Sequence, residues 1–184
     1  LHERLVSTLF VPMTGESEEQ RRILPDANHP ELANGGFEID ANDDDNADGW
    51  HYQRHAELIG DSPVQGNHFI RFTAEEDGEV AQALQGMAVS GRTLSVIDFS
   101  CWAQAKNIRH GLKGERAGIA IHFYDSKRHE LAVQIVARWD GSFSWHRIRR
   151  QVRIPKQARE MIIRIGLNGA PGTLELDDLK LSGR

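Results

Sequence analysis

Cysteine is almost absent from this chain of 184 residues, which has only Cys101 and therefore cannot form an internal disulfide. Cys101 ends the apolar run Val96–Cys101, where a buried, unreactive thiol is expected rather than a nucleophile. No apolar stretch approaches the roughly 20 residues of a membrane-spanning helix. Stability must therefore come from packing, with a bound metal as a second source.

An excess of positive charge is also missing. Lys and Arg number 22 against 27 Asp and Glu, which gives a formal net charge of −5. This balance gives no electrostatic case for binding nucleic acid or an anionic membrane. The chain begins at Leu1 with neither a methionine nor a signal-like segment. We therefore expect it to be part of a larger multidomain protein.

Signatures of catalysis are lacking as well. None of the nine histidines has a His-x-x-x-His or His-x-His spacing in a supporting context, and no Gly-x-Ser-x-Gly elbow exists. Jelly-roll glycosidases need two carboxylates facing each other across a cleft, and few acids lie on the expected strands. Some jelly-roll lyases use a Gln-x-His strand, whereas this chain has Gln134-Ile135-Val136. We do not expect an enzyme.

Short apolar runs separated by Gly, Asn and Asp clusters dominate the chain from Leu32 onward. Several runs alternate, with Ile119, Ile121 and Phe123 on one face and Leu131, Val133, Ile135 and Ala137 on another. This alternation, with a period of two residues, predicts antiparallel sheets that each bury one side. We therefore expect an all-β, two-sheet sandwich of the jelly-roll type. The expected strands are 35–39, 50–59, 67–73, 79–85, 92–105, 117–124, 130–139, 144–154, 160–167 and 172–181.

Residues 1–31 differ from the rest and are expected to form a short, partly helical N-terminal arm or linker. Leu5, Val6, Leu9 and Phe10 have helical spacing, and prolines break the chain before residue 31. Residues 32–184 form the expected β-sandwich domain.

A family resemblance rests on the order of several short segments. Asn34-Gly35-Gly36-Phe37-Glu38 comes first and Leu176-Asp177-Asp178-Leu179-Lys180-Leu181 last, with Asp48-Gly49-Trp50 and Gly66 to Phe72 between them. In this order the chain resembles carbohydrate-binding modules of families four, nine and twenty-two, over roughly residues 32–182. The resemblance implies a galactose-binding-like jelly roll that is non-catalytic and binds a polysaccharide or oligosaccharide. It also implies an extracellular, periplasmic or cell-surface location within a larger protein.

The resemblance further implies a structural calcium ion where the first and last strands meet. Calcium takes six to eight oxygen ligands, carbonyls included. Without a metal, Glu38 and Asp177 would instead hydrogen-bond to loop amides. The implied ligands are the Gly36 carbonyl, the Glu38 and Asp177 carboxylates, Asp61 and the Asn67 carbonyl.

A second acidic segment, Asp40–Gly49, matches the start of an EF-hand loop at Asp44, Asn46 and Asp48. The match fails at the twelfth position, which is His55 rather than Glu. A solvated loop, in which Asp and Asn side chains mimic backbone turns, is the favoured interpretation.

A ligand-binding face is predicted from strand alternation. Along residues 98–104, Trp102 and Gln104 lie opposite the expected core side, which is an unusual place for a tryptophan on a wet surface. If the other strands are neighbours, the same alternation completes one polar, partly aromatic face. Its residues are Trp102, Gln104, His122, Tyr124, Gln134, Arg138 and Arg164. The alternative is a solvated sheet on which the arm covers Trp102.

The remaining aromatic and basic residues give weaker indications. Trp50 is expected in the core and Trp145 is expected to be a packing residue, whereas Trp139, beside Asp140-Gly141, could be an exposed platform. The run of Arg147, Arg149, Arg150 and Arg153 favours a solvated strand face, with an acidic polysaccharide as the alternative. A carbohydrate-binding module is therefore the leading interpretation, and a jelly-roll spacer or protein-interaction domain without a sugar site is the alternative.

Overall fold

The computed structural model describes residues 26–184, and all regular secondary structure in that part is β. The helical segments expected before residue 26 lie outside the described residues. The strands are β1 (His51–Arg54), β2 (Ala56–Ile59), β3 (Phe69–Ala74), β4 (Gln82–Ala88), β5 (Val96–Ile108), β6 (Ala117–Tyr124), β7 (Glu130–Trp139), β8 (Gly141–Arg153), β9 (Glu160–Gly166) and β10 (Gly172–Gly183).

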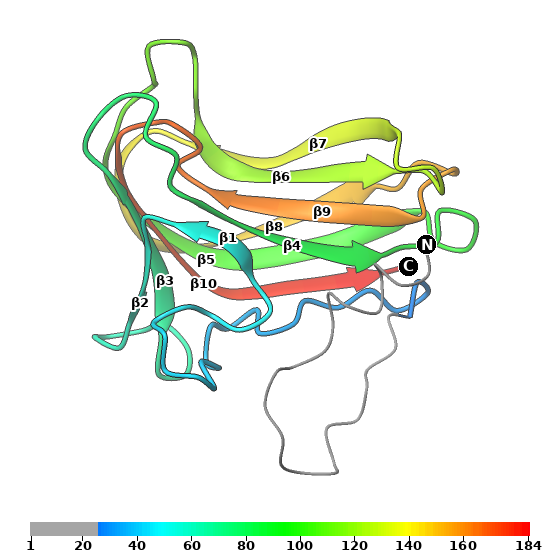
Figure 1. The fold of residues 1–184 in the computed structure, drawn as a ribbon, viewed down its shortest axis with the longest axis horizontal. Helices are drawn as coiled ribbons and strands as arrows, with labels where there is room; N and C mark the ends of the chain where they lie inside the picture. The colour runs from blue at the N-terminus through cyan, green and yellow to red at the C-terminus, as the bar shows by residue number, and fades with distance from the viewer. Residues whose placement is uncertain (1–25) are drawn as a thin grey trace.

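The strands form two five-stranded sheets, which we call sheet A and sheet B (Figure 1). Sheet A has the order β1-β4-β9-β6-β7, and sheet B has the order β2-β3-β10-β5-β8. Neighbouring strands are antiparallel in both sheets. The predicted all-β, two-sheet sandwich is therefore confirmed.

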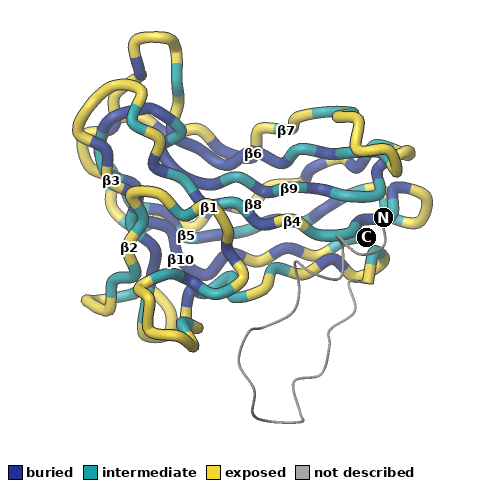
Figure 2. Tube along the Cα trace, viewed as in Figure 1, coloured by how far each residue is buried: buried dark blue, intermediate teal, exposed yellow. Residues whose placement is uncertain are grey.

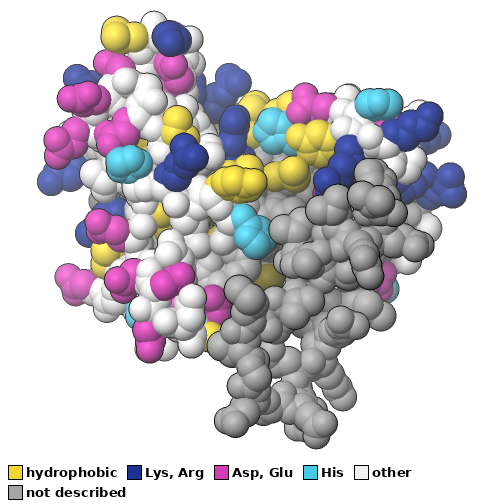
Figure 3. Space-filling view, in the orientation of Figure 1, with side chains coloured by type: hydrophobic (Ala, Val, Ile, Leu, Met, Phe, Trp, Pro, Cys, Tyr) yellow, Lys and Arg dark blue, Asp and Glu magenta, His cyan; other side chains and the backbone are white. Residues whose placement is uncertain are grey.

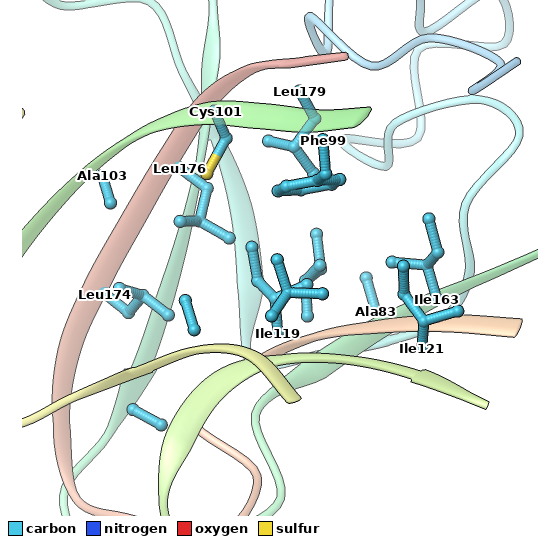
Figure 4. Packing of buried hydrophobic residues seen from close by; sticks show 14 of the residues in the cluster. Ala83, Phe99, Cys101, Ala103, Ile119, Ile121, Ile163, Leu174, Leu176 and Leu179 are labelled. Atoms are coloured by element: carbon cyan, nitrogen blue, oxygen red, sulfur yellow. The ribbon is translucent and has the colours of Figure 1, made fainter. Parts of the chain in front are cut away.

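The core fills the space between the two sheets (Figures 2 and 4). Side chains of sheet A such as Ile119, Ile121 and Ile163 face Phe99 and Leu176 of sheet B, and all five are buried. Burying a side chain of this size stabilises the fold by roughly 1.5–3 kcal/mol. Cys101 lies among these residues and is fully buried, as predicted.

The segment expected to be the first strand, 35–39, is a turn. Asn34 and Phe37 have positive φ values of 50° and 60°, which a continuous strand does not allow. Phe37 is nevertheless fully buried, with its ring centroid 5.5 Å from that of Trp50. Trp50 is only 4% exposed and donates from Nε1 to the Asn34 carbonyl at 3.1 Å. Trp50 thus has its predicted core role.

The expected strand 50–59 is two strands that belong to different sheets. His55, with a φ of 46°, separates β1 of sheet A from β2 of sheet B. A single alternation count across this segment therefore assigns side chains to the wrong faces.

The predicted core face of β7 is also partly wrong. Val133 and Ile135 are 43% and 48% exposed, whereas Val136 is 4% exposed. The register explains this difference, because Ile119 pairs with Ala137 but the next residue, Ala120, pairs with Ile135. The bulge leaves Val136 as an extra residue and turns Ile135 to the outer side of sheet A.

Candidate functional site

The structure divides the predicted ligand-binding face between two sheets. Trp102 and Gln104 lie on β5, whose neighbours are β10 and β8 in sheet B. His122, Tyr124, Arg138 and Arg164 lie on β6, β7 and β9 of sheet A. Both groups point away from the core, so they lie on opposite outer sides of the sandwich. The prediction of a single face containing both groups is therefore wrong.

Gln134 is also misplaced in that prediction. It pairs with Ile121, whose side chain is fully buried in the core. Paired residues of an antiparallel ladder point to the same side, so Gln134 faces away from the outer surface that carries His122.

The outer face of sheet A consists of cross-strand rows that the register defines. Each row runs from β4 through β9 and β6 to β7, and the first two rows also extend to β1. The rows are Arg54, Gln82, Gly166, Gly118 and Arg138; His51, Leu84, Arg164, Ala120 and Ile135; Gly86, Ile162, His122 and Val133; and Ala88, Glu160, Tyr124 and Glu130.

A depression of about 350 Å³ lies on this face, and we call it the sheet A depression. Gly118 and Ala120 of β6 and part of β7 form its floor. Beside Gly118, Gly166 has a φ of +133°, and a Cβ there would collide with the Ala81 carbonyl oxygen. Gly166 thus allows β9 to approach the Ala81 backbone closely, while Gly118 and Ala120 contribute little side-chain bulk to the lining. The lining consists of Lys113, Gly114, Glu115, Arg116, Gly118, Ile119, Ala120, Ile135, Ala137, Arg138, Arg164 and Asn168.

Two polar atoms in this lining are buried and have no hydrogen-bond partner among the described residues. They are Nε of Arg164, a donor, and Oδ1 of Asn168, an acceptor. The Asn168 amide nitrogen donates to the Gly166 carbonyl at 3.1 Å and to the Gly118 carbonyl at 3.4 Å, which fixes the orientation of the side chain. A buried polar group without a partner is costly.

Apolar and aromatic groups continue this face beyond the depression. Val133 and Ile135 expose their side chains, and Nδ1 of His122 lies 2.9 Å from Oε2 of Glu130. The Tyr124 hydroxyl donates to the same oxygen at 3.5 Å. Partial burial, followed by the Glu130 charge, raises the pKa of Tyr124. Figure 3 shows hydrophobic and histidine side chains exposed where β6 and β7 run.

Sequence reasoning missed Tyr52, Leu84 and Ile162 on or beside this face. Tyr52 of β1 is 72% exposed, but the prediction of one strand over 50–59 hid its position at the edge of sheet A. Ile162 alternates with the buried Met161 and Ile163, and this pattern is visible in the sequence.

The polar groups on the outer face of sheet B mainly satisfy one another. Glu175 is 6% exposed and lies 2.6 Å from Nη2 of Arg71, and it accepts a 2.7 Å hydrogen bond from Nε2 of Gln104. Trp145 is half-buried and packs edge-on against the buried Phe69, with ring centroids 5.4 Å apart, so it is a packing residue but lies outside the core between the sheets. Trp102 is half-buried.

Trp139 is not an exposed platform. It is only 9% exposed, and its ring centroid lies 6.4 Å from that of Phe143. The residue pairs with the buried Ala117, so it faces the core.

The two central carboxylates of the predicted calcium site contact one loop. Glu38 accepts hydrogen bonds from the backbone nitrogens of Asn67 at 3.0 Å and His68 at 3.1 Å. Asp177 accepts from the backbone nitrogens of Val64 and Gln65, both at 2.9 Å. Loop amides therefore hold both carboxylates, as in the metal-free alternative.

Asp177 retains one feature that fits a cation. Its Oδ1 is buried and has no partner within residues 26–184, and burial raises the pKa of this carboxyl. A cation beside Oδ1 would offset that desolvation. Gly36 lies beside Glu38. Asp61 is exposed, and its carboxylate accepts a hydrogen bond from the Ser62 hydroxyl at 3.1 Å.

The described residues contain no cluster of three His, Cys, Asp or Glu side chains that could hold a metal. A calcium ion here would therefore need backbone or amide oxygens in addition to the carboxylates.

The acidic loop Asp40–Gly49 contains the local hydrogen bonds expected of a turn-rich loop. Asp40 accepts from the backbone nitrogens of Asp44 and Asp45 at 3.2 and 3.0 Å, and Asp48 accepts from that of Ala41 at 3.1 Å. These bonds agree with the favoured interpretation of side chains that mimic backbone turns.

Comparison with solved structures shows which folds are similar. The C-terminal family 22 carbohydrate-binding module of Clostridium thermocellum Xyn10B has a TM-score of 0.53 and 19% identity, over 87% of this chain and 96% of that module. A family 16 carbohydrate-binding module has a TM-score of 0.53 and 12% identity, over 79% of this chain and 98% of that module. The chain shares its fold with carbohydrate-binding modules. The resemblance inferred from the sequence is thus confirmed for the fold.

The same fold occurs inside longer chains. The enzymatically active domain of tailspike protein 4 from bacteriophage CBA120 matches 83% of this chain with a TM-score of 0.63 and 12% identity. This chain spans only 21% of that protein's length. No family model and no curated protein matches the sequence.

Proposed function

We propose that this chain is a non-catalytic carbohydrate-binding module and that the outer face of sheet A binds a polysaccharide. The observation that carries the proposal is the sheet A depression itself, whose lining combines the Arg138 and Arg164 side chains with the Asn168 amide. A sugar hydroxyl both donates and accepts hydrogen bonds, so sugar hydroxyls can pair with guanidinium donors and with an amide group of this lining.

The surroundings of the depression suit a sugar chain. The exposed Val133 and Ile135, together with His122 and Tyr124, offer apolar and aromatic surface to the C–H faces of the sugar rings. Arg138 and Arg164 make no ion pair with a carboxylate in the described part of the chain, so both guanidinium groups are available to ligand oxygens.

The wider role follows from the kind of protein in which such folds occur. One similar structure joins a family 22 module to a glycoside hydrolase family 10 module, and it was determined with xylohexaose. We propose that this chain likewise targets a larger secreted or surface protein to a polysaccharide. Among the described residues, no helix is long and apolar enough to cross a membrane. A spacer or protein-interaction domain is the competing role, and it predicts no polysaccharide binding.

We also propose a structural calcium ion beside Asp177 and Glu38. Oδ1 of Asp177 is the best-supported ligand, because it is buried without a partner. The Gly36 and Asn67 carbonyls would complete the oxygen set, since Gly36 lies beside the Glu38 side chain and the Asn67 backbone nitrogen donates to its carboxylate. When bound, calcium would neutralise the two carboxylates and hold the Val64–His68 loop against β10.

Affinity electrophoresis of the full chain tests the proposed function. Gels containing xylan, arabinoxylan, mixed-linkage glucan or galactomannan should include at least one that retards the protein. Arg164→Ala should then weaken the retardation, whereas Trp102→Ala, on the opposite sheet, should leave it unchanged. Failure of every gel, or equal loss in both variants, would contradict the proposal.

A further inference from the structure

The outer face of sheet B carries a second hollow, formed by β8, β5 and β10, with a volume of about 700 Å³. Ser100 and Asp98 of β5 line its centre, with Arg149 and Gln151 of β8 on one side and Lys180 of β10 on the other. We call these five residues, with the flanking Arg147 and Arg153 of β8, the basic groove.

The register places three arginines of this groove on one face. Arg147, Arg149 and Arg153 pair with Trp102, Ser100 and Val96 of β5. These residues alternate with the buried Ile148 and Val152, so the three guanidinium groups are on the outer side of the sheet. Successive outward positions on a strand are about 6.6 Å apart, so the row from Arg147 to Arg153 is roughly 20 Å long.

The acids near the groove already have partners. Asp98 accepts from Nε2 of Gln151 at 2.9 Å and from Nε of Arg184 at 2.8 Å, and Asp178 pairs with Lys180 at 2.8 Å. Within residues 26–184, Arg147, Arg149 and Arg153 form no ion pair with any carboxylate. In a chain with a net charge of −5, such a row is a local excess of positive charge.

We propose that the basic groove binds the carboxylates of an acidic polysaccharide, a linear chain of uronic acid residues. A guanidinium group binds a carboxylate with two parallel hydrogen bonds. The row of arginines is roughly 20 Å long, about three times the spacing of successive outward residues, so it suits a polymer with repeated carboxylates better than a single small anion. A nucleic acid fits less well, because the chain is acidic overall. The choice of a polysaccharide as the polymer rests on the proposed function.

The test is affinity electrophoresis of the full chain in gels containing polygalacturonate, with fully methyl-esterified polygalacturonate as the uncharged comparison. We expect retardation by polygalacturonate alone, weakening as salt is raised, because salt screens exposed charges. Arg147→Gln with Arg149→Gln should lower the affinity about tenfold, since each exposed ion pair contributes modestly. Arg109→Gln with Lys127→Gln removes the same charge from exposed positions outside both sites and should have no effect.

Several outcomes overturn the proposal. They are no binding of polygalacturonate, equal binding of the esterified polymer, equal loss in the two double variants, and tighter binding of single-stranded DNA. A melting curve for each variant identifies any loss of fold. Arg149→Lys retains the charge, so replacing Arg149→Gln by Arg149→Lys in the double variant should restore part of the affinity for polygalacturonate. Neutral polysaccharide binding is measured on the same proteins. Retardation by polygalacturonate without any neutral ligand would contradict the proposed sheet A site and leave the basic groove supported.

Discussion

Arg164 and Asn168 line one depression on the outer face of sheet A, and each holds a buried polar atom without a partner in the described chain. One atom is a donor and the other an acceptor. Arg164 is on β9, and Asn168 lies just beyond its end, where its amide group bonds the Gly118 and Gly166 carbonyls. The strand ladder therefore fixes the position of Arg164 in the sheet, and these bonds fix the orientation of the Asn168 amide.

Filling the depression should weaken polysaccharide binding without unfolding the protein. Ala120 is 4% exposed and lines the depression, so Ala120→Leu would occupy space needed by a sugar ring. We expect at least about a tenfold loss of affinity for the polysaccharide found by the gel screen, or about 1.4 kcal/mol. Isothermal titration measures the affinity, and a melt measures the stability.

Ala88→Leu is the matched control for this experiment. Ala88 pairs with Glu160 in another row of the same face and is not part of the depression lining. It should bind like the wild type. If Ala120→Leu binds equally well, sugar recognition does not involve the depression.

Calcium should raise the melting temperature. An ion bound only by the folded state adds stability by mass action, and roughly 1–2 kcal/mol corresponds to about 2–8 °C in a domain of this size. Melting curves in calcium and in chelator measure the difference. Asp177→Asn should remove it, whereas Asp61→Asn should keep it because the Asp61 carboxylate bonds the Ser62 hydroxyl rather than the loop amides that hold Glu38 and Asp177. Identical wild-type curves would argue against the ion.

Cys101 should resist alkylation in the folded protein. Burial is the main cause that raises the pKa of its thiol to about 12, so almost no reactive thiolate exists at pH 9. Mass spectrometry after iodoacetamide treatment at pH 9 should show unmodified protein, and the same treatment in denaturant should show complete modification. Rapid labelling of the native chain would mean that β5 opens or that the thiol faces solvent.

Trp50→Ala should destabilise the fold by about 3–5 kcal/mol, the usual loss for a buried aromatic side chain. The change removes packing against Phe37 and the hydrogen bond from Nε1 to the Asn34 carbonyl. Chemical denaturation measures the free energy of unfolding. A loss below about 1 kcal/mol would show that the 34–37 turn does not depend on Trp50.

Period-two alternation was sufficient to predict most of the sandwich, because one buried face per strand leaves a clear pattern in β5, β6 and β9. It failed where the backbone departs from a regular strand. The positive φ values of Asn34, Phe37 and His55, and the bulge at Val136, have no comparable signal in the pattern of apolar residues.

The candidate site was harder to predict than the fold. Alternation assigns a residue to a side of its own strand, but the neighbour of that strand depends on long-range pairing. Trp102 and His122 both face outward, yet β5 pairs with β8 and β10 while β6 pairs with β7 and β9. The prediction of one face assumed that these strands are neighbours, whereas the fold divides them between two sheets.

The most direct test of the central claim is amide-shift mapping by two-dimensional NMR, with an oligosaccharide of the polysaccharide selected in the gel screen. The account predicts that the largest shifts occur at Gly118, Ala120, Arg164 and Asn168 on sheet A, while Ser100, Arg149 and Lys180 on sheet B do not shift. Shifts confined to sheet B, or none at saturating oligosaccharide, would contradict a polysaccharide site on the outer face of sheet A.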